Sequence, residues 1–430
     1  MLWLYRLCFL PALLVVLPAY ARRMRRRGGY GEKFGHRFGG HPGLPAKAEA
    51  ARRVWLQAVS VGEMLAVGPL LEALHRSGAE VYLTTTTSTG YQLARERYAA
   101  LTLGIGYFPI DWWLFSARAW KRIDPDLVVL TEGERWPEHV RQARLRGVPV
   151  VGINARISDR SFRRLRAFRP AARLVLADIS RLLPASALDE ARFRQLGFSA
   201  ERLTTTGNLK LDVAIPRLEP AALGALRREL GLPEGPVLVG ASTWPGEETA
   251  LVAALQQARA AGLACTLLLV PRHAERRESL EHELAATGLR CHFRSRGAAP
   301  GPVDVAVADT TGELRNLLQL ADLVFVGKSL PPHAEGQTPV EAAALEKPIL
   351  FGPGMGNFKA IARDLRRRGA ALEVADPPAL AQAVRDLLGS AEQRERLAAA
   401  VAAWHRENGG AMDRTLAILR EELAKCRRRI

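Results

Sequence analysis

The sequence lacks the short patterns by which several common classes of protein are recognised. Its four cysteines lie far apart and form no CxxC pair: Cys8, Cys265, Cys291 and Cys426. Neither a zinc site nor a disulfide scaffold is therefore indicated, and a reducing compartment fits best. No HExxH or paired-histidine spacing predicts a metal site, no GxGxxG or GxxxxGKS turn predicts an NAD-type site or a P-loop, and no GxSxG predicts a hydrolase triad. We expect neither a metal nor a cofactor.

Aromatic residues are scarce, and acidic residues are outnumbered by basic ones. Phe, Trp and Tyr make up 7% of the 430 residues, and 61 Lys and Arg stand against 44 Asp and Glu, for a net charge of +17. This excess predicts a polyanionic partner such as an acidic membrane surface, a phosphorylated substrate or nucleic acid. An Arg-rich composition shared by a whole proteome would produce the same excess. Because the basic residues are not interleaved with aromatic ones, we expect no nucleic-acid partner.

The N-terminal apolar run is too short to predict a membrane span. It extends from Leu7 to Tyr20, contains two prolines, and is shorter than the roughly 20 residues that a spanning helix needs. An arginine cluster at 22–27 follows this run, whereas a signal peptide carries its charges before it. We therefore expect residues 1–40 to form an interfacial or membrane-inserted anchor helix held by anionic headgroups on the cytoplasmic side. A single spanning helix is the alternative.

The rest of the chain alternates short apolar runs with amphipathic stretches, which predicts parallel βαβ units. The pattern runs from VWLQAVS to VPVVGINA, is interrupted by a proline-containing stretch, and restarts at PVLVGAS. We predict an α/β protein of the GT-B glycosyltransferase type, with two Rossmann-like domains and an interdomain cleft. The expected boundaries are a first domain at 41–212, a linker at 213–222, a second domain at 223–405, and a C-terminal helix at 406–430 that packs back on the first domain.

The turn after the first predicted strand carries a candidate catalytic carboxylate. Ligands of parallel sheets bind beyond the carboxyl ends of the strands, and Ser60-Val61-Gly62-Glu63 follows such a strand. In the first turn of a helix, Glu63 would be favoured in its ionised form and able to act as a general base toward a hydroxyl group. The same Ser-x-x-Glu spacing is typical of a capping box. The residues alone leave both interpretations open.

A series of motifs resembles the 3-deoxy-D-manno-octulosonic acid (Kdo) transferases, membrane-bound enzymes that add Kdo to lipid A. WLQAVSVGEMLAVGPLLEAL resembles their signature segment, and the apolar start and the basic stretch ending in HRFG are also similar. Further motifs follow in the family's order: TEGERWP (131–137), NARISDRS (154–161), GNLKLD (207–212), GASTWPGEE (240–248), VPRHAER (270–276), DTTGEL (309–314), ADLVFVGKSL (321–330), GQTPVEAA (336–343) and GPGMGNF (352–358). The resemblance is specific because so many motifs occur in order along nearly the whole chain.

The resemblance implies an inverting glycosyltransferase on the cytoplasmic face of the inner membrane. It would move Kdo from CMP-Kdo, bound by the second domain, to the lipid A precursor lipid IVA, bound by the first. Glu63 matches the family's proton acceptor. The family's CMP contacts fall on Pro271, Arg272, Gly312, Glu313, Leu314, Thr338, Pro339, Val340 and Glu341.

These roles have physical reasons as well as plainer alternatives. Arg272 can pair with the phosphate of a CMP-sugar, Gly312 precedes a helix whose free N–H groups would face an anion, and Glu341 can accept hydrogen bonds from ribose hydroxyls. Equally, Arg272 can be a solvated arginine after a strand, Thr310–Glu313 a capping box, and Glu341 a glutamate at a helix start. Lys210 of GNLKLD is a second candidate for the phosphate contact.

The predicted donor half departs from the family pattern at four places. Thr338 stands where the family has Asn, Lys328 where it has a second Gly, and Trp244 where it has His, and the segment PPHAEGQ (331–337) is unlike the usual glycine-rich pair. These departures concern the identity of the sugar donor. The alternatives are a related transferase with another sugar donor or acceptor, and a non-catalytic, membrane-tethered protein that binds polyanions.

Overall fold

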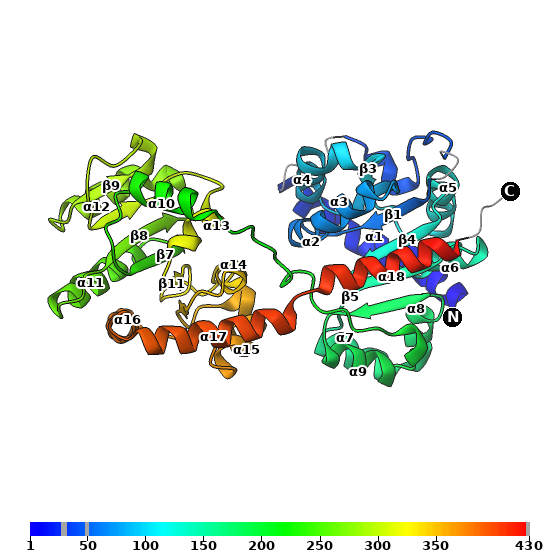
Figure 1. The fold of residues 1–430 in the computed structure, drawn as a ribbon. Coiled ribbons are helices and arrows are strands. Elements are labelled where there is room, and N and C mark those ends of the chain that lie inside the picture. Colours follow the sequence, from blue (N-terminus) through cyan, green and yellow to red (C-terminus); the bar gives the residue numbers. More distant parts are fainter. Residues whose placement is uncertain (27–31, 48–50, 427–430) are drawn as a thin grey trace. The chain divides into compact units, whose positions relative to one another are not determined.

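The computed structural model describes residues 1–26, 32–47 and 51–426 (Figure 1). The chain forms two compact units, which we call the N-terminal unit (1–212 together with the stretch from 409 onward) and the C-terminal unit (213–408). Each contains one parallel sheet with helices packed against it. The predicted α/β class with two parallel-sheet domains is therefore confirmed.

The N-terminal unit is built on six parallel strands in the order β3-β2-β1-β4-β5-β6. In register, Val54 lies opposite Val81 on one side and Leu127 on the other. The strands β1, β4 and β5 are buried along their whole length, as a parallel sheet covered on both faces requires. The bounds are β1 Arg53–Gln57, β2 Glu80–Thr85, β3 Gly104–Tyr107, β4 Leu127–Thr131, β5 Val150–Ala155 and β6 Arg181–Pro184.

Two apolar clusters cover the two faces of this sheet, because side chains alternate along each strand. Leu56 belongs to one cluster and the neighbouring Trp55 to the other. The C-terminal helix α18 (Ala411–Lys425) adds Leu416 and Leu419 to the first cluster, and therefore completes the core of the N-terminal unit. The other helices are α2 Val61–Ala66, α3 Gly68–Arg76, α4 Ser88–Tyr98, α5 Trp113–Ile123, α6 Pro137–Leu145, α7 Asp159–Ala167, α8 Arg169–Leu176 and α9 Ala187–Gln195.

The first helix, α1 (Leu2–Arg26), is bonded to the N-terminal unit by buried polar groups. Arg6 donates to the Glu138 carboxylate through Nε at 2.5 Å and Nη2 at 3.0 Å, and the Tyr5 hydroxyl donates to Asp111 at 2.6 Å. Glu138 and Asp111 are almost completely buried. Because a buried carboxylate without a partner is costly, these bonds make α1 part of the unit rather than a free tether.

The described part of the chain contains no helix long and apolar enough to cross a membrane. The anchor predicted for residues 1–40 is therefore not shown as a spanning helix. That prediction also depends on the arginine cluster at 22–27. Arg27 and the side chains of Arg23, Arg25 and Arg26 lie outside the part of the chain that the structure describes.

The C-terminal unit is built on seven parallel strands in the order β13-β12-β11-β7-β8-β10-β9. Its core includes Leu238, Leu267 and Phe325 from the three central strands. The bounds are β7 Val237–Thr243, β8 Thr266–Pro271, β9 Cys291–Phe293, β10 Val305–Val307, β11 Leu323–Val326, β12 Ile349–Phe351 and β13 Leu372–Glu373.

The helices of the C-terminal unit precede, connect and follow these strands. The helix α10 (Pro220–Glu229) begins within the stretch 213–222 that the sequence suggested as a linker. The remaining helices are α11 Glu247–Ala260, α12 Arg277–Ala285, α13 Leu314–Leu317, α14 Val340–Ala344, α15 Lys359–Arg367, α16 Pro377–Gly389 and α17 Ala391–Asn408.

In both sheets the first strand of the unit pairs with strands on either side of it. β1 lies between β2 and β4, and β7 lies between β8 and β11. The direction in which the chain adds strands reverses at these positions. Such a topological switch point leaves a crevice beyond the carboxyl ends of the two strands, where ligands of α/β proteins bind.

Candidate active site

Glu63 lies at the switch point of the N-terminal unit, in the first turn of α2. Its backbone N–H donates to the Ser60 hydroxyl oxygen at 3.3 Å, and the Ser60 hydroxyl lies 3.1 Å from Glu63 Oε1. The backbone N–H of Val59 donates to Glu63 Oε2 at 2.9 Å. The capping arrangement suggested by the Ser-x-x-Glu spacing is thus present. It does not exclude catalysis, because the carboxylate also has a partner outside the helix.

That further partner comes from the neighbouring strand. Thr131, the last residue of β4, donates its hydroxyl to Glu63 Oε2 at 2.6 Å. The bond connects the carboxyl ends of β1 and β4, and it has no part in capping α2. Glu63 is 9% exposed, so its carboxylate is held in one place at the edge of the sheet with a small accessible surface. A carboxylate fixed in this way would need no reorganisation before accepting a proton.

Lys210 contacts Glu132, the residue that follows Thr131 in the chain. Its ammonium group is 2.5 Å from Glu132 Oε1, and the Asn154 side-chain amide donates to the same oxygen at 3.3 Å. Asn154 Oδ1 in turn accepts from the backbone of Leu209, which ties the GNLKLD segment to the end of β5. Lys210 belongs to the N-terminal unit, and in this structure its charge is balanced by Glu132.

A second carboxyl group near Glu63 has a raised pKa. Burial, together with the charge of Glu63, raises the pKa of Glu134 to about 7. The Trp136 indole donates to Glu134 Oε2 at 2.5 Å, which favours the ionised form but does not outweigh burial. Near neutral pH, Glu134 therefore holds a proton part of the time, beside a carboxylate proposed as a proton acceptor.

The sequence interpretation missed three of these residues. Thr131, Glu132 and Glu134 belong to the motif TEGERWP, and the sequence alone assigns none of them a chemical role. The signal that identifies them is their position at the end of β4, the strand that pairs with β1 at the switch point: Thr131 is its last residue, and Glu132 and Glu134 follow it. Sequence periodicity finds each strand but not this pairing.

The other predicted residues lie at the carboxyl edge of the sheet in the C-terminal unit. Pro271 is the buried last residue of β8, and the backbone N–H of Arg272 donates to Thr243 at 3.1 Å. The next two arginines are engaged, Arg276 with Glu248 and Arg277 with Asp309. The exposed Arg272 guanidinium has no ion-pair or hydrogen-bond partner in the described part of the chain. It is available for an anionic ligand.

The turn 312–314 follows β10. Gly312 has φ +87°, a conformation suited to glycine. The Arg294 guanidinium donates to both carboxylate oxygens of Glu313, at 2.9 and 2.8 Å, and the Thr310 hydroxyl donates to it as well. The hydrogen bonds from Arg294 lower the pKa of Glu313. Because this carboxylate is already satisfied, the backbone of the turn is the part left for a ligand. The helix that follows, α13, has four residues and continues as a 3-10 turn at Leu318–Leu320.

The segment 338–341 follows β11 and begins α14. Thr338 Oγ1 accepts from the backbone N–H of Val340 at 3.2 Å, and Pro339 precedes the first helical residue. Glu341 is more informative: its Oε2 is buried without a hydrogen-bond partner among the described residues, and the Arg315 guanidinium is 3.8 Å from its Oε1. Burial raises the pKa of Glu341. Hydroxyl donors from a ligand would remove the cost of this unpaired acceptor.

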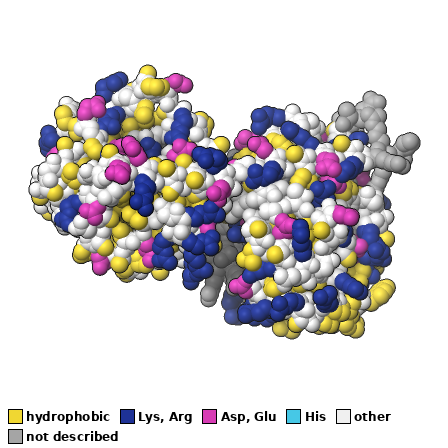
Figure 2. All heavy atoms as spheres, turned by 60° about the horizontal axis from the view of Figure 1, so that its bottom comes forward, with side chains coloured by type: hydrophobic (Ala, Val, Ile, Leu, Met, Phe, Trp, Pro, Cys, Tyr) yellow, Lys and Arg dark blue, Asp and Glu magenta, His cyan; other side chains and the backbone are white. Residues whose placement is uncertain are grey.

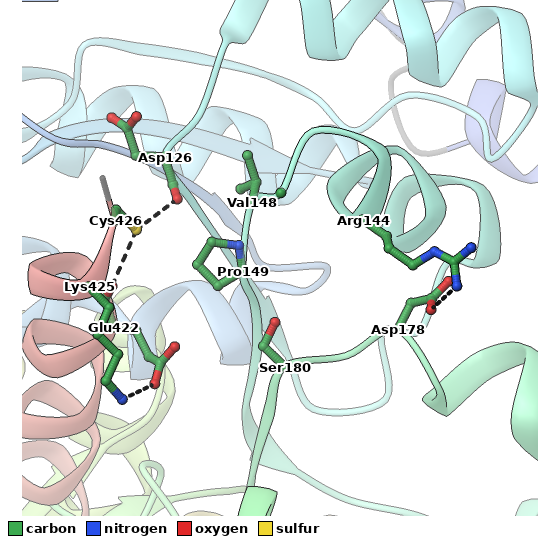
Figure 3. A pocket seen from close by; sticks show the side chains of 10 residues that line it. Asp126, Arg144, Val148, Pro149, Asp178, Ser180, Glu422, Lys425 and Cys426 are labelled. Carbon is green, nitrogen blue, oxygen red and sulfur yellow. Dashed lines mark hydrogen bonds and ion pairs between the residues drawn. The ribbon is translucent and has the colours of Figure 1, made fainter. Parts of the chain in front are cut away.

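A separate cavity of about 580 Å³ lies at the opposite edge of the N-terminal sheet (Figure 3). Asp126, Pro149 and Ser180 line it just before β4, β5 and β6, and Lys425 and Cys426 line it from the end of α18. It stands at the amino ends of the strands, where this class of sheet does not place its ligands. The described residues contain no group of three or more His, Cys, Asp or Glu that could hold a metal ion.

Comparison with known proteins identifies the family of this chain. A family model described as 3-deoxy-D-manno-octulosonic-acid transferase (kdotransferase) matches residues 31–213. The 3-deoxy-D-manno-octulosonic acid transferase of Bordetella pertussis is 37% identical over 416 residues, covering 94% of this chain and 95% of that protein. That of Haemophilus influenzae is 31% identical over 423 residues, covering 97% and 96%.

Among solved structures, the C-terminal CMP-Kdo binding domain of WaaA from Acinetobacter baumannii is 27% identical with a TM-score of 0.40, covering 42% of this chain and 94% of that one. A glycosyltransferase from Rickettsia africae is 12% identical with a TM-score of 0.53, covering 87% and 100%, and shares the fold. The two parallel-sheet units are thus similar to GT-B glycosyltransferases. On the identity and coverage of its relatives, this chain belongs to the family of Kdo transferases, glycosyltransferases that use CMP-Kdo.

Proposed function

We propose that this transferase adds Kdo to the lipid A precursor lipid IVA, with Glu63 as the general base. Glu63 accepts the proton of the acceptor hydroxyl while the oxygen of that hydroxyl group forms a bond to the anomeric carbon of Kdo. The bond between that carbon and the phosphate oxygen breaks, and CMP leaves with the bonding electron pair. A single displacement of this kind inverts the configuration of the anomeric carbon. The observation that carries the proposal is the position of Glu63, fixed by Thr131 at a switch point.

For the donor, we propose that CMP binds at the carboxyl edge of the C-terminal sheet. The unpaired Arg272 guanidinium neutralises the phosphate, the 312–314 backbone approaches it, and Glu341 accepts hydrogen bonds from the ribose hydroxyls. The turn Thr338–Val340 holds Glu341 in place. Lys210 remains a second candidate for a phosphate contact, although it would have to exchange its bond with Glu132.

Because the proposed acceptor is a lipid, the enzyme would act at a membrane surface. The surface around α1 supports an interfacial attachment on the cytoplasmic face of the inner membrane. Trp3, Leu4 and Leu7 are more than half exposed, and with Trp112 and Trp113 they line an apolar hollow. At the start of α1, Met1 lines a second hollow with Arg169 and Arg173 of α8. The helix α7, which packs against α8, carries further exposed arginines: Arg160, Arg163, Arg164 and Arg166. Lys and Arg side chains adjoin apolar ones along the lower margin of the unit on the right in Figure 2.

An apolar surface edged by arginines suits the boundary between acyl chains and anionic headgroups. Because α1 is bonded through Arg6 and Tyr5, its exposed side chains keep a fixed orientation on the unit. We therefore propose that the protein lies on the bilayer through this surface.

The proposal is tested by incubating the purified full-length protein with CMP-Kdo and tetraacylated lipid A precursor, and measuring product masses. We expect the acceptor to gain the mass of one or more Kdo residues and CMP to be released in equal amount. A parallel reaction with CMP-N-acetylneuraminic acid tests another sugar acid as donor. An unchanged acceptor mass in the presence of CMP-Kdo, with the protein folded and CMP bound, would contradict the proposed acceptor.

A further inference from the structure

The departures from the family pattern come together at one place in the C-terminal unit. Trp244 follows β7 and Lys328 follows β11, and the Lys328 ammonium lies 4.1 Å from the centre of the Trp244 ring. Two further neighbours come from the unusual segment 331–337: the ring of His333 is 5.9 Å from that of Trp244, and Glu335 Oε1 is 3.7 Å from Lys328 Nζ. The ring of His273, which follows β8, is 5.1 Å from that of Trp244. Residues distant in sequence therefore lie together here. We call the two central residues, Trp244 and Lys328, the Trp244–Lys328 pair.

A buried carboxylate fixes the backbone of both members of the pair. Glu247, which is 1% exposed, accepts hydrogen bonds from the backbone N–H groups of Trp244, Lys328, Ser329 and Leu330, at 2.7–3.0 Å. Lys328 itself has φ +57°, a left-handed conformation that glycine adopts without strain and lysine does not. A lysine at this position is therefore not explained by the backbone. What it adds is a positive charge in a fixed place.

The pair stands between the segments proposed to hold CMP. The backbone of Arg272 is bonded to Thr243, the residue before Trp244, at 3.1 Å. On the other side, the N–H of Gly336 donates to the carbonyl of Lys328 at 2.8 Å, just before the segment 338–341. The strands β7 and β11 are the two strands of the switch point in this sheet. The ammonium group is thus at the crevice where a ligand of this fold binds.

The Lys328 charge is weakly satisfied in the structure. Its contact with Glu335 is long, and the Glu335 side chain is 52% exposed, so a ligand anion can replace it at small cost. The face of Trp244 stabilises the cation but does not neutralise it. The indole Nε1 of Trp244 is also buried without a hydrogen-bond partner among the described residues. A cation and an unused donor together form a place for an anion.

We propose that the Trp244–Lys328 pair binds the carboxylate of the donor sugar. Kdo is a sugar acid whose carboxylate is attached to the anomeric carbon, the same carbon that carries the CMP phosphate. The donor therefore presents two adjacent anions, and the protein offers two cations after the strands that flank β7: Arg272 after β8 for the phosphate, and Lys328 after β11 for the carboxylate. The inference rests on the proposed CMP site and adds a contact to the sugar carboxylate made by a residue in which this chain departs from the family pattern.

The test compares a ligand that has the carboxylate with one that lacks it. In Lys328→Met, the KM for CMP-Kdo should rise about 10- to 100-fold, since a charge-assisted contact is lost. The inhibition constant of CMP, which has no sugar carboxylate, should change less than about twofold. Lys328→Arg should keep most of the affinity for CMP-Kdo. Arg396→Gln, which removes an exposed charge on α17, serves as the control and should change neither constant.

A second variant examines the aromatic partner. Trp244→Leu should also raise the KM for CMP-Kdo, and its effect should not add to that of Lys328→Met, because the two side chains act together. If Lys328→Met weakens CMP and CMP-Kdo equally, or weakens neither, the inference is wrong while the proposed function stands. If the unmodified protein does not bind CMP, the proposed function itself fails. A variant that has not folded is recognised, without any ligand, by the loss of a cooperative unfolding transition, and Lys328→Arg then decides.

Discussion

Replacing Glu63 by glutamine separates the two roles that its position allows. The amide is nearly the same size as the carboxylate, and its oxygen can still accept from Thr131 or from the backbone of Val59. The variant loses the negative charge and the ability to take a proton. Hydrogen bonds to a charged group contribute about 1.5–3 kcal/mol and neutral ones about 0.5–1.5. The free energy of unfolding should therefore fall by about 1–2 kcal/mol.

The catalytic consequence is expected to be much larger. A positioned general base contributes about 10²- to 10⁴-fold to the rate, equivalent to roughly 3–5 kcal/mol in the activation barrier. We expect kcat for Kdo transfer to fall by this factor. Binding of CMP should be unchanged, because the residues proposed to hold it belong to the C-terminal unit.

Three measurements on Glu63→Gln distinguish the roles: kcat with CMP-Kdo and the lipid A precursor, thermal stabilisation by CMP, and unfolding in urea. Glu72→Gln, a change to an exposed residue of α3, is the matched control and should behave as the parent protein. Near-normal turnover in Glu63→Gln would refute the assignment of the base. Loss of both CMP stabilisation and folding would mean that Glu63 is structural.

Three further predictions concern the phosphate, a buried acid and the membrane surface. Arg272→Ala should weaken CMP binding about 10- to 100-fold with little change in the KM for the acceptor, because the phosphate loses its charge-assisted partner; calorimetry with CMP measures this. Glu134→Gln should raise the free energy of unfolding by about 2–4 kcal/mol at pH 8 and change it little at pH 5. The reason is that the pKa of Glu134, about 7 against an ordinary 4.5, makes the folded state lose stability as the pH rises through 7. Replacing both Trp3 and Leu7 by serine should lower partitioning onto anionic vesicles about 10-fold or more, as measured by sedimentation.

Each of these predictions has a result that contradicts it. Equal CMP affinity in Arg272→Ala would move the phosphate contact to Lys210. Parallel stability curves for Glu134→Gln and the parent between pH 5 and 8 would mean that the group is ionised normally. For the membrane surface, Leu188→Ser on α9 is the control, since Leu188 is a similarly exposed leucine. Equal loss of vesicle binding in both variants would show a nonspecific effect. Deleting α1 would be a poor test, because Glu138 would lose Arg6.

The sequence by itself determined the order of strands and helices, the two-sheet class and the position of Glu63 after the first core strand. These follow from local patterns: apolar runs of strand length, helical periodicity, and a Ser-x-x-Glu turn. The motifs in their order added the family. The alternatives for Glu63 stayed open at that level, because a capping glutamate and a catalytic one have the same neighbours in sequence.

Only the tertiary structure decided which distant residues meet. The bond between Thr131 and Glu63, the tie between Arg6 and Glu138, and the contact of Trp244 with Lys328 all join residues far apart in the chain. Each depends on which strand ends or helices become neighbours, and periodicity carries no information about that order. Strand pairing at the two switch points arises from burying both faces of each sheet at once, so the sites they create exist only in the folded chain.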